Sequence, residues 1–314
     1  MRPVLRIAVA LGLTTVAFAA ERSAQVESPD VLTLRRMVAT VNAGDAAGYA
    51  RLYSPGAVIT IYGGEKIEGR EAIERYEAAL MHEFPATRLA FYSVWQAAPD
   101  TAVHYGVNGQ TTTGQRMGHE GLLFFRFDQA GAIVQERRYL DSLTPMAQLG
   151  AFGKTVARPL PVLPAGLIVH RTSGAAVLKT NFAIASAALA AMELKDANTF
   201  FARTAAGTLS VDELMLAKPL YGQPNAAQWF AMWSAVRGLK IDITRMLGAG
   251  DDVVVETITH GTLSAPIGRV PAAERTFAVH RAIVLQVRSG AIARLASFIN
   301  GKELAEQTGQ WPLH

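Results

Sequence analysis

The hydrophobic positions of residues 28–152 recur first at helical spacing and then at strand spacing. Apolar side chains fall every three or four positions over residues 31–42 and stop before Gly44, which predicts a helix with a glycine end. Asp45 is expected to cap a second short helix that runs to Pro55. The first part of the chain therefore begins with two helices.

The rest of this segment predicts a hairpin, a third helix and a run of long strands. Gly63 and Gly64 form the expected turn of the hairpin. The predicted elements, in order, are hairpin strands 57–62 and 66–68, a helix over 70–84, strands over 88–98, 101–113, 118–127 and 132–141, and a closing helix around 148–150.

The closing pattern of the first part recurs 159 residues later. Residues 133–141 and 148–150 align without a gap on residues 292–300 and 307–309, and Asp141 is replaced by Asn300. Earlier matches differ by 151 to 153 residues, so extra residues around 265–274 predict a longer hairpin loop. The pattern predicts two domains of one fold, and the first alone keeps a carboxylate at this position.

Two segments fall outside the predicted domains. Three prolines within residues 158–164 predict a linker, because proline neither continues a helix nor joins the middle of a sheet. Residues 1–20 combine Arg2, Arg6, an apolar run and small residues near Ala19, as export signals do. The expected division is a signal peptide over 1–20, domains over 28–152 and 173–314, and a proline-rich linker over 153–172.

Export predicts a periplasmic or secreted protein, and an uncleaved anchor helix is the alternative for residues 1–20. The apolar run of that segment is shorter than the roughly 20 residues that a membrane span needs. Residues 182–192 are apolar over 11 positions only, so no stable span is expected after signal cleavage.

Composition narrows the classes of function. The chain has 30 Lys and Arg against 26 Asp and Glu, and without Arg2 and Arg6 the charges nearly balance. No basic stripe interleaved with aromatic residues occurs, so no nucleic-acid partner is expected. The chain has no cysteine, and no histidine pair has the spacing of a zinc motif. We therefore expect no metal and no cofactor.

The order of elements, together with the segment from Arg138 to Gly150, resembles the SnoaL-like, polyketide cyclase-like domains of the nuclear transport factor 2-like superfamily. The resemblance is stronger over residues 30–150 than over 173–310. It implies an α+β fold of two tandem cone-shaped domains, each a curved antiparallel sheet wrapped against about three helices around an apolar pocket. The superfamily contains isomerases, dehydratases, epoxide hydrolases, cyclases and proteins that only bind, so the resemblance leaves the reaction open.

Strand register provides a candidate site. If Phe127 and Ile133 flank a turn, His119 falls opposite Asp141 with Cβ atoms about 5 Å apart. A carboxylate beside an imidazole in an apolar pocket predicts an acid/base pair, with His119 held in one tautomer. The resemblance implies that Asp141 is the general acid/base. The alternatives are a structural ion pair, a cap of the helix that begins near Thr144, and a register shifted by one residue.

Further polar and aromatic residues are candidates to contact a ligand, although aromatic residues in sheets usually belong to the core. The candidate binding residues are Tyr62, Trp95, Tyr105, Asn108, Arg137, Tyr139, His280 and Asn300.

Two functions follow from these expectations. The first is an exported, cofactor-independent cyclase, isomerase or lyase that acts on a small hydrophobic carbonyl compound. The alternative is a protein that binds a hydrophobic small molecule without changing it. In both cases the two domains are expected to pack through their sheets as an intrachain pseudo-dimer.

Overall fold

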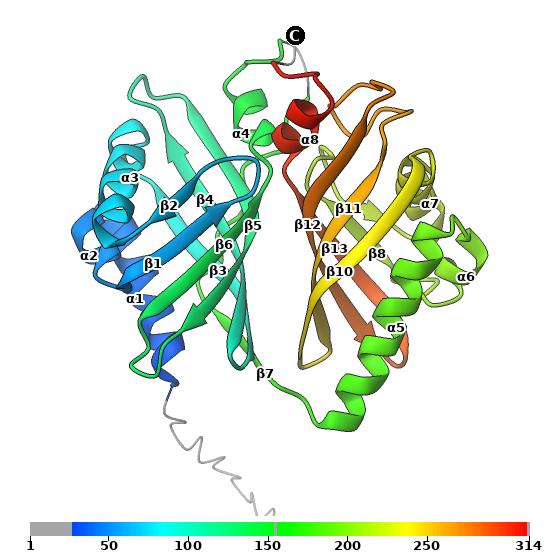
Figure 1. Cartoon of the computed structure of the whole chain (residues 1–314), viewed down its shortest axis with the longest axis horizontal. Helices are drawn as coiled ribbons and strands as arrows, with labels where there is room; N and C mark the ends of the chain where they lie inside the picture. The colour runs from blue at the N-terminus through cyan, green and yellow to red at the C-terminus, as the bar shows by residue number, and fades with distance from the viewer. Residues whose placement is uncertain (1–26, 154–155, 313–314) are drawn as a thin grey trace, which may run out of the picture.

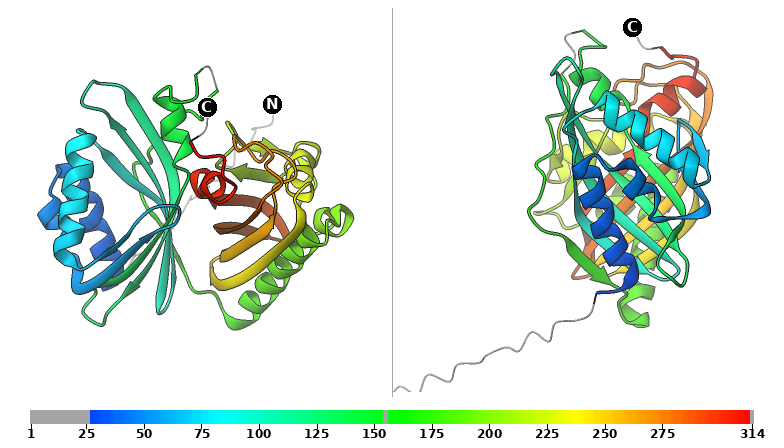
Figure 2. Two further views of the ribbon diagram at one scale, coloured as in Figure 1. Left: turned by 45° about the horizontal axis from the view of Figure 1, so that its top comes forward. Right: turned by 90° about the vertical axis from the view of Figure 1, so that its left-hand side faces the viewer.

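The computed structural model describes residues 27–153 and 156–312, which form two halves built on separate sheets. The expected signal peptide lies outside these residues. The two sheets face each other in the middle of the molecule, and the helices α1–α3 and α5–α7 lie on the outer sides (Figure 1). Two further views show α1, α2 and α3 covering the outer face of the first sheet (Figure 2).

The first half has the predicted order of helices and strands. Its elements are α1 (Pro29–Ala43), α2 (Ala46–Ala50), β1 (Tyr53–Ile61), β2 (Lys66–Glu68), α3 (Arg70–Glu83), β3 (Arg88–Ala97), β4 (Asp100–Gln110), β5 (Arg116–Phe127), β6 (Ile133–Leu140) and α4 (Leu143–Gln148).

The second half has the same order, and it is preceded by the linker strand β7, which joins the first sheet. Its elements are β7 (Ile168–Arg171), α5 (Ala175–Glu193), α6 (Ala197–Phe201), β8 (Ser210–Glu213), β9 (Leu220–Tyr221), α7 (Gln223–Ser234), β10 (Arg237–Ala249), β11 (Asp252–Thr262), β12 (Thr276–Arg288), β13 (Ala291–Ile299) and α8 (Gly301–Gln307). The loop between β11 and β12 contains the expected extra residues.

The α+β class is confirmed, but both sheets are mixed where antiparallel sheets were expected. The first sheet has the order β2-β1-β6-β5-β4-β3-β7, and the second has β10-β11-β12-β13-β8-β9. Strand β1 runs parallel to β6, and β8 runs parallel to β13. The parallel pair arises because the chain leaves the β1–β2 hairpin through α3 and returns to β1 only with its last long strand.

The second helix is shorter than expected. It ends at Ala50, and Tyr53 already belongs to β1. Pro55 disfavours a helix in this stretch because its ring clashes with the preceding turn. The expected cap is present, since the Asp45 carboxylate accepts a hydrogen bond of 2.7 Å from the Gly48 N–H.

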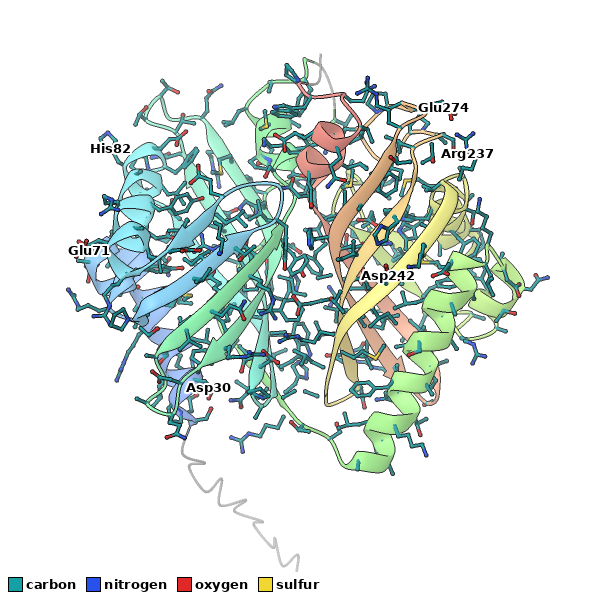
Figure 3. The ribbon with its side chains drawn as sticks, viewed as in Figure 1. Asp30, Glu71, His82, Arg237, Asp242 and Glu274 are labelled. Carbon is teal, nitrogen blue, oxygen red and sulfur yellow. The ribbon has the colours of Figure 1, made fainter. Side chains whose placement is uncertain are left out.

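Apolar side chains form one core inside each half and a third core between the sheets. The third core combines Trp95, Phe124 and Tyr139 of the first sheet with Leu247 and Phe298 of the second. Side chains fill the space between the two sheets (Figure 3). The face of the first sheet that points away from its helices is therefore covered by the second half.

The segment expected to be a linker lies against the first sheet. Its strand β7 pairs parallel with β3, and the Pro161 carbonyl accepts a hydrogen bond of 2.9 Å from the Asn108 side chain. Leu167 and Val169 pack against the core of the first half.

Helix α5 is longer than the apolar stretch noted in the sequence. It has 19 residues and is the one helix of residues 27–153 and 156–312 that is long and apolar enough to cross a membrane, by length and composition alone. It packs against β10 and neighbouring strands, and Leu189 and Met192 are buried there. The sequence had predicted an apolar stretch of only 11 residues here, too short for a membrane span, and this length was wrong.

Candidate functional site

A cavity of about 580 Å³ lies mainly in the first half, between α1 and α3 and the face of the first sheet that these helices cover. Its wall is mainly aliphatic and aromatic. Representative apolar lining residues are Met37, Val41, Leu80, Val107, Leu123 and Met146. A cavity of this size and character suits a small, mostly apolar molecule.

Polar side chains reach this wall from several elements, among them β6, α3 and β4. Glu136 and Arg138 lie two residues apart on β6, so both point to the helix-covered face of the sheet. Glu77 comes from α3, one turn after the buried Ile73. Tyr105 of β4 also lines the cavity, as expected for a binding residue.

Arg138 is the centre of a buried hydrogen-bond network. Its guanidinium donates to Glu77 Oε1 and Glu136 Oε1, both at 2.7 Å, and to the Tyr49 hydroxyl at 2.8 Å. The Tyr53 hydroxyl hydrogen-bonds the second Glu136 oxygen and lies 2.7 Å from the Tyr49 hydroxyl. The network fixes the positions of both carboxylates at the cavity wall.

The charges of this network do not balance, because one guanidinium faces two carboxylates. Burial raises the pKa of Glu77, and the positive charge of Arg138 opposes the rise. Burial also raises the pKa of Tyr49 and Tyr53, which keeps both phenols protonated. Glu77 is thus a carboxyl group held nearer to neutrality than an exposed glutamate.

His119 of β5 lines the same cavity. Its Nδ1 lies 3.3 Å from the Glu120 carbonyl, and its ring meets the Tyr105 ring edge-on with centroids 5.7 Å apart. Burial lowers the pKa of His119, which favours the neutral imidazole.

The expected cross-strand pair of His119 and Asp141 is not formed. Strand β6 ends at Leu140, before Asp141. A bulge beside Phe127 shifts the register between β5 and β6 by one residue, so Leu140 pairs with Gly121. Asp141 lies outside the cavity lining. Its carboxylate accepts hydrogen bonds from the Thr144 hydroxyl at 2.8 Å and the Leu143 N–H at 3.2 Å. Asp141 therefore bonds to the first turn of α4, which is close to the alternative that it caps this helix.

Three expected binding residues lie on the opposite face of the first sheet. Arg137 donates two hydrogen bonds of 2.8 Å to the Glu256 carboxylate, and the Tyr139 hydroxyl donates to Glu256 at 2.8 Å. The Trp95 indole donates to Asp252 at 2.7 Å. These side chains join the two halves and do not line the cavity, because strand alternation turns them away from it.

The remaining expected binding residues also have partners outside the cavity. The Tyr62 ring stacks on the His280 ring at 3.9 Å, and His280 lies 2.9 Å from a Glu303 oxygen. Asn300 hydrogen-bonds the Tyr62 carbonyl at 2.9 Å. Asn108, as described above, bonds to the linker.

The inside of the second half is filled by large side chains. Trp229 and Trp233 of α7 donate to the buried Glu213 carboxylate at 3.2 and 3.3 Å, and Arg281 donates to it at 3.1 Å. Trp233 lies eleven residues after Gly222, where the first half has Leu80 eleven residues after Gly69. By sequence position, Trp233 therefore corresponds to Leu80, which lines the cavity of the first half.

Glu77, Glu136 and Arg138 were not among the predicted site residues. A usable signal was present, since Glu77 lies on the apolar face of α3 between Ile73 and Leu80, where a charged residue needs a partner. Within the described residues no group of three His, Asp or Glu side chains is placed to hold a metal ion.

The first half of the chain is similar to a known protein family. Residues 34–136 match the family model described as the SnoaL-like domain. This segment is a SnoaL-like domain. We refer below to residues 28–152 as the SnoaL-like domain. Comparison of the sequence with curated proteins gives no match.

Solved structures of three proteins are similar to part of the chain. RV0760c of Mycobacterium tuberculosis, in complex with estradiol-17beta-hemisuccinate, is 18% identical over 37% of this chain and 96% of its own, with a TM-score of 0.35. A hypothetical protein of Catenulispora acidiphila with a ketosteroid isomerase-like fold is 23% identical over 40% and 92%, with a TM-score of 0.34. An NTF2-like protein of Exiguobacterium is 15% identical over 35% and 98%, with a TM-score of 0.33.

Proposed function

We propose that the SnoaL-like domain binds a small, mostly apolar molecule that carries a polar group such as a carbonyl. The proposal rests on the apolar cavity of about 580 Å³, which has Glu77, Arg138 and His119 in its wall. The aliphatic wall favours an apolar body, and the few polar groups would orient its polar end.

We further propose that the second half is a divergent domain of the same fold and supports the first. Its order of elements, and the core between the two sheets, favour an intrachain pseudo-dimer. Its interior is packed around Trp229 and Trp233, so the ligand is assigned to the SnoaL-like domain alone. We also propose that the protein is exported and that residues 153–172 are the linker between its two domains.

The binding proposal is tested with the neutral naphthalene ketone dye Prodan, whose emission shifts in an apolar site. We expect saturable binding of one dye per chain. Leu80→Trp places an indole where the second half has Trp233, and should weaken binding about tenfold or more. Ala79→Trp, on the exposed side of the same helix, is the matched control. Equal binding by both variants would place the dye elsewhere and reject the proposal.

A second candidate function is acid/base catalysis on a bound carbonyl compound. It is favoured by Glu77, because burial raises the pKa of this carboxyl group toward the range in which it both takes and returns a proton. Glu77 would remove a proton from the carbon next to the carbonyl group and exchange it with solvent. It would then return a proton of the solvent to the same carbon of the enolate. Arg138, beside Glu77, would balance the change in charge.

This reaction is detected as exchange of deuterium from heavy water into the ketone β-tetralone, followed by nuclear magnetic resonance. Glu77→Gln should slow protein-dependent exchange about 100-fold and leave Prodan affinity within a few-fold. Glu74→Gln, on the exposed side of α3, is the control. If wild-type protein gives no exchange above buffer while it binds the dye, the binding function stands and catalysis on such ketones is rejected.

A further inference from the structure

We propose that Asn300, in the second half of the chain, is a positioning residue for the mouth of the cavity in the SnoaL-like domain. It joins two segments of the rim and thereby sets how fast a ligand leaves. This inference rests on the proposed binding function, and it assigns to the second half a role in retaining the ligand.

Two short segments of the cavity lining lie next to Asn300, and we assign them to the rim of its mouth. One is the turn between β1 and β2, from which Gly63, Gly64 and Glu65 line the cavity. The other is the start of α4, from which Ser142 lines the cavity. In the ribbon, α4 and α8 lie next to each other at one end of the molecule (Figure 1).

Asn300 bonds to both rim segments with one side chain. Its Nδ2 donates to the Tyr62 carbonyl at 2.9 Å and to the Ser142 hydroxyl at 3.2 Å. Its Oδ1 accepts from the Ser142 N–H at 3.3 Å and the Lys302 N–H at 3.0 Å. Two donated and two accepted hydrogen bonds use the full capacity of an amide.

The side chain is buried, with 2% of its surface exposed, so water does not easily replace these partners. An aspartate at this position would keep the acceptors and lose both donors. One of its oxygens would face the Tyr62 carbonyl, with no proton between them. The geometry therefore requires an amide here, whereas the corresponding Asp141 has only N–H and O–H donors around it.

Other contacts bring the same part of the second half against the turn. Gly63 has φ +71°, and a Cβ on it would meet the Asn300 Nδ2 at 2.8 Å and the Glu303 Cβ at 2.7 Å. Lys302 itself lines the cavity, and its Nζ lies 3.4 Å from the Gly63 carbonyl. The wall of the cavity is thus incomplete without the second half.

Opening of the mouth by movement of the turn or α4 breaks hydrogen bonds to Asn300. Loss of these bonds raises the population of open states, because each bond contributes a net stabilisation when its groups are buried. We expect Asn300→Ala and Asn300→Asp to speed Prodan dissociation about tenfold, measured by stopped-flow fluorescence. Hydrogen exchange of the amides of residues 63–65, measured without dye, should accelerate as well.

The control is Trp95→Phe, which removes the hydrogen bond of the Trp95 indole to Asp252 between the same two halves. Trp95 lies outside the cavity lining, so this variant should lose stability while dye dissociation and exchange at residues 63–65 stay within twofold. If Asn300→Ala fails to fold, Ser142→Ala removes one rim partner of Asn300 and is measured in its place.

Three outcomes separate the proposals. Faster dissociation in the Asn300 variants but not in Trp95→Phe supports a positioning role. Unchanged dissociation and exchange in folded Asn300 variants, or equal acceleration in Trp95→Phe, overturns it. Absence of dye binding in the wild type would reject the binding function, and the exchange measurement would then decide alone whether Asn300 holds the rim.

Discussion

The Oδ1 atom of Asp141 lies 3.2 Å from the backbone nitrogen of Gly301, so the end of the first sheet is bonded to the first turn of α8. Asp141 also accepts from the Leu143 N–H in the first turn of α4, and Asn300 caps α8 by accepting from the Lys302 N–H. Each residue therefore bonds to the first turn of the helix that follows it and contacts the other half. The difference between carboxylate and amide follows from the donors and acceptors that surround each side chain.

The bonding of Asp141 to the first turn of α4 predicts a graded response to substitution. In Asp141→Asn, the amide oxygen keeps the bonds to the Leu143 and Gly301 N–H groups, and the Thr144 hydroxyl turns to accept from the amide. We expect the free energy of unfolding to stay within about 1 kcal/mol of the wild type. Asp141→Ala leaves buried donors without partners and should cost about 1 to 3 kcal/mol.

Chemical denaturation measures these changes, and Prodan titration measures the cavity separately. Burial raises the pKa of Asp141, so the asparagine variant also loses any penalty of an ionised buried group. A normal stability combined with complete loss of β-tetralone exchange in Asp141→Asn would contradict the assignment and return Asp141 to a catalytic role.

The buried His119 predicts a specific pH dependence of stability. Its pKa lies below the ordinary value of 6.5 in the folded protein, so the unfolded chain binds a proton that the folded chain does not. The contribution of His119 is fully present above pH 6.5 and is lost as the pH falls through its folded pKa. His119→Gln should lack this loss.

The measurement is the free energy of unfolding of both proteins between about pH 8 and pH 5. Their difference should change by no more than about 1.4 kcal/mol per pH unit, the limit for one proton. Subtraction removes the contributions of the other histidines. Parallel curves for the two proteins would show that His119 titrates alike in the folded and unfolded chains.

The contact between Arg137 and Glu256 predicts a strong coupling between the halves. The side chains are 8% and 4% exposed, and Arg137→Ala leaves a buried carboxylate with weaker partners. We expect a loss of about 3 kcal/mol in the free energy of unfolding. Glu256→Gln in the Arg137→Ala background should restore part of it, because the neutral amide is less costly to bury.

A double-mutant cycle from the wild type, the two single variants and the double variant gives the coupling energy. Arg126→Ala, at a more exposed arginine of the same sheet, is a control that should cost less. Additive effects of the Arg137 and Glu256 substitutions would mean that the two halves do not depend on this pair.

The arrangement of helices and strands could largely be predicted from hydrophobic spacing and glycine positions. Gly44 ends α1 with φ +70°, and Gly63 and Gly64 form the turn of the expected hairpin. The bulge beside Phe127 could not be predicted, because the alternation of apolar and polar residues along a strand does not show where one residue is left unpaired. That single shift removed the expected pair of His119 and Asp141.

The site was harder to predict because it depends on which face of each strand the second half covers. The sequence shows that Arg137 and Arg138 point to opposite faces, but not which one enters the cavity. Glu256, far away in the chain, pairs with Arg137 and so leaves Arg138 on the cavity side. Packing between the halves, and not local pattern, assigns these two arginines.

The filled interior of the second half leads to the last prediction, the substitution Trp233→Ala. Trp233 is fully buried, its ring lies 4.1 Å from the Arg281 guanidinium carbon, and its indole bonds to Glu213. Removing the ring should cost about 3 to 5 kcal/mol in the free energy of unfolding. Tyr221→Ala, at an aromatic residue with 67% of its surface exposed, should cost about 0.5 kcal/mol or less.

The same substitution tests whether one tryptophan separates a filled interior from a binding cavity. The space left by the indole would be bounded by apolar side chains together with Arg281 and Glu213, so a folded Trp233→Ala protein should bind a second Prodan molecule. Dye titration at fixed protein concentration gives the stoichiometry. Unchanged stoichiometry with the expected loss of stability would mean that neighbouring side chains collapse into the space, and the difference between the halves would then involve more than Trp233.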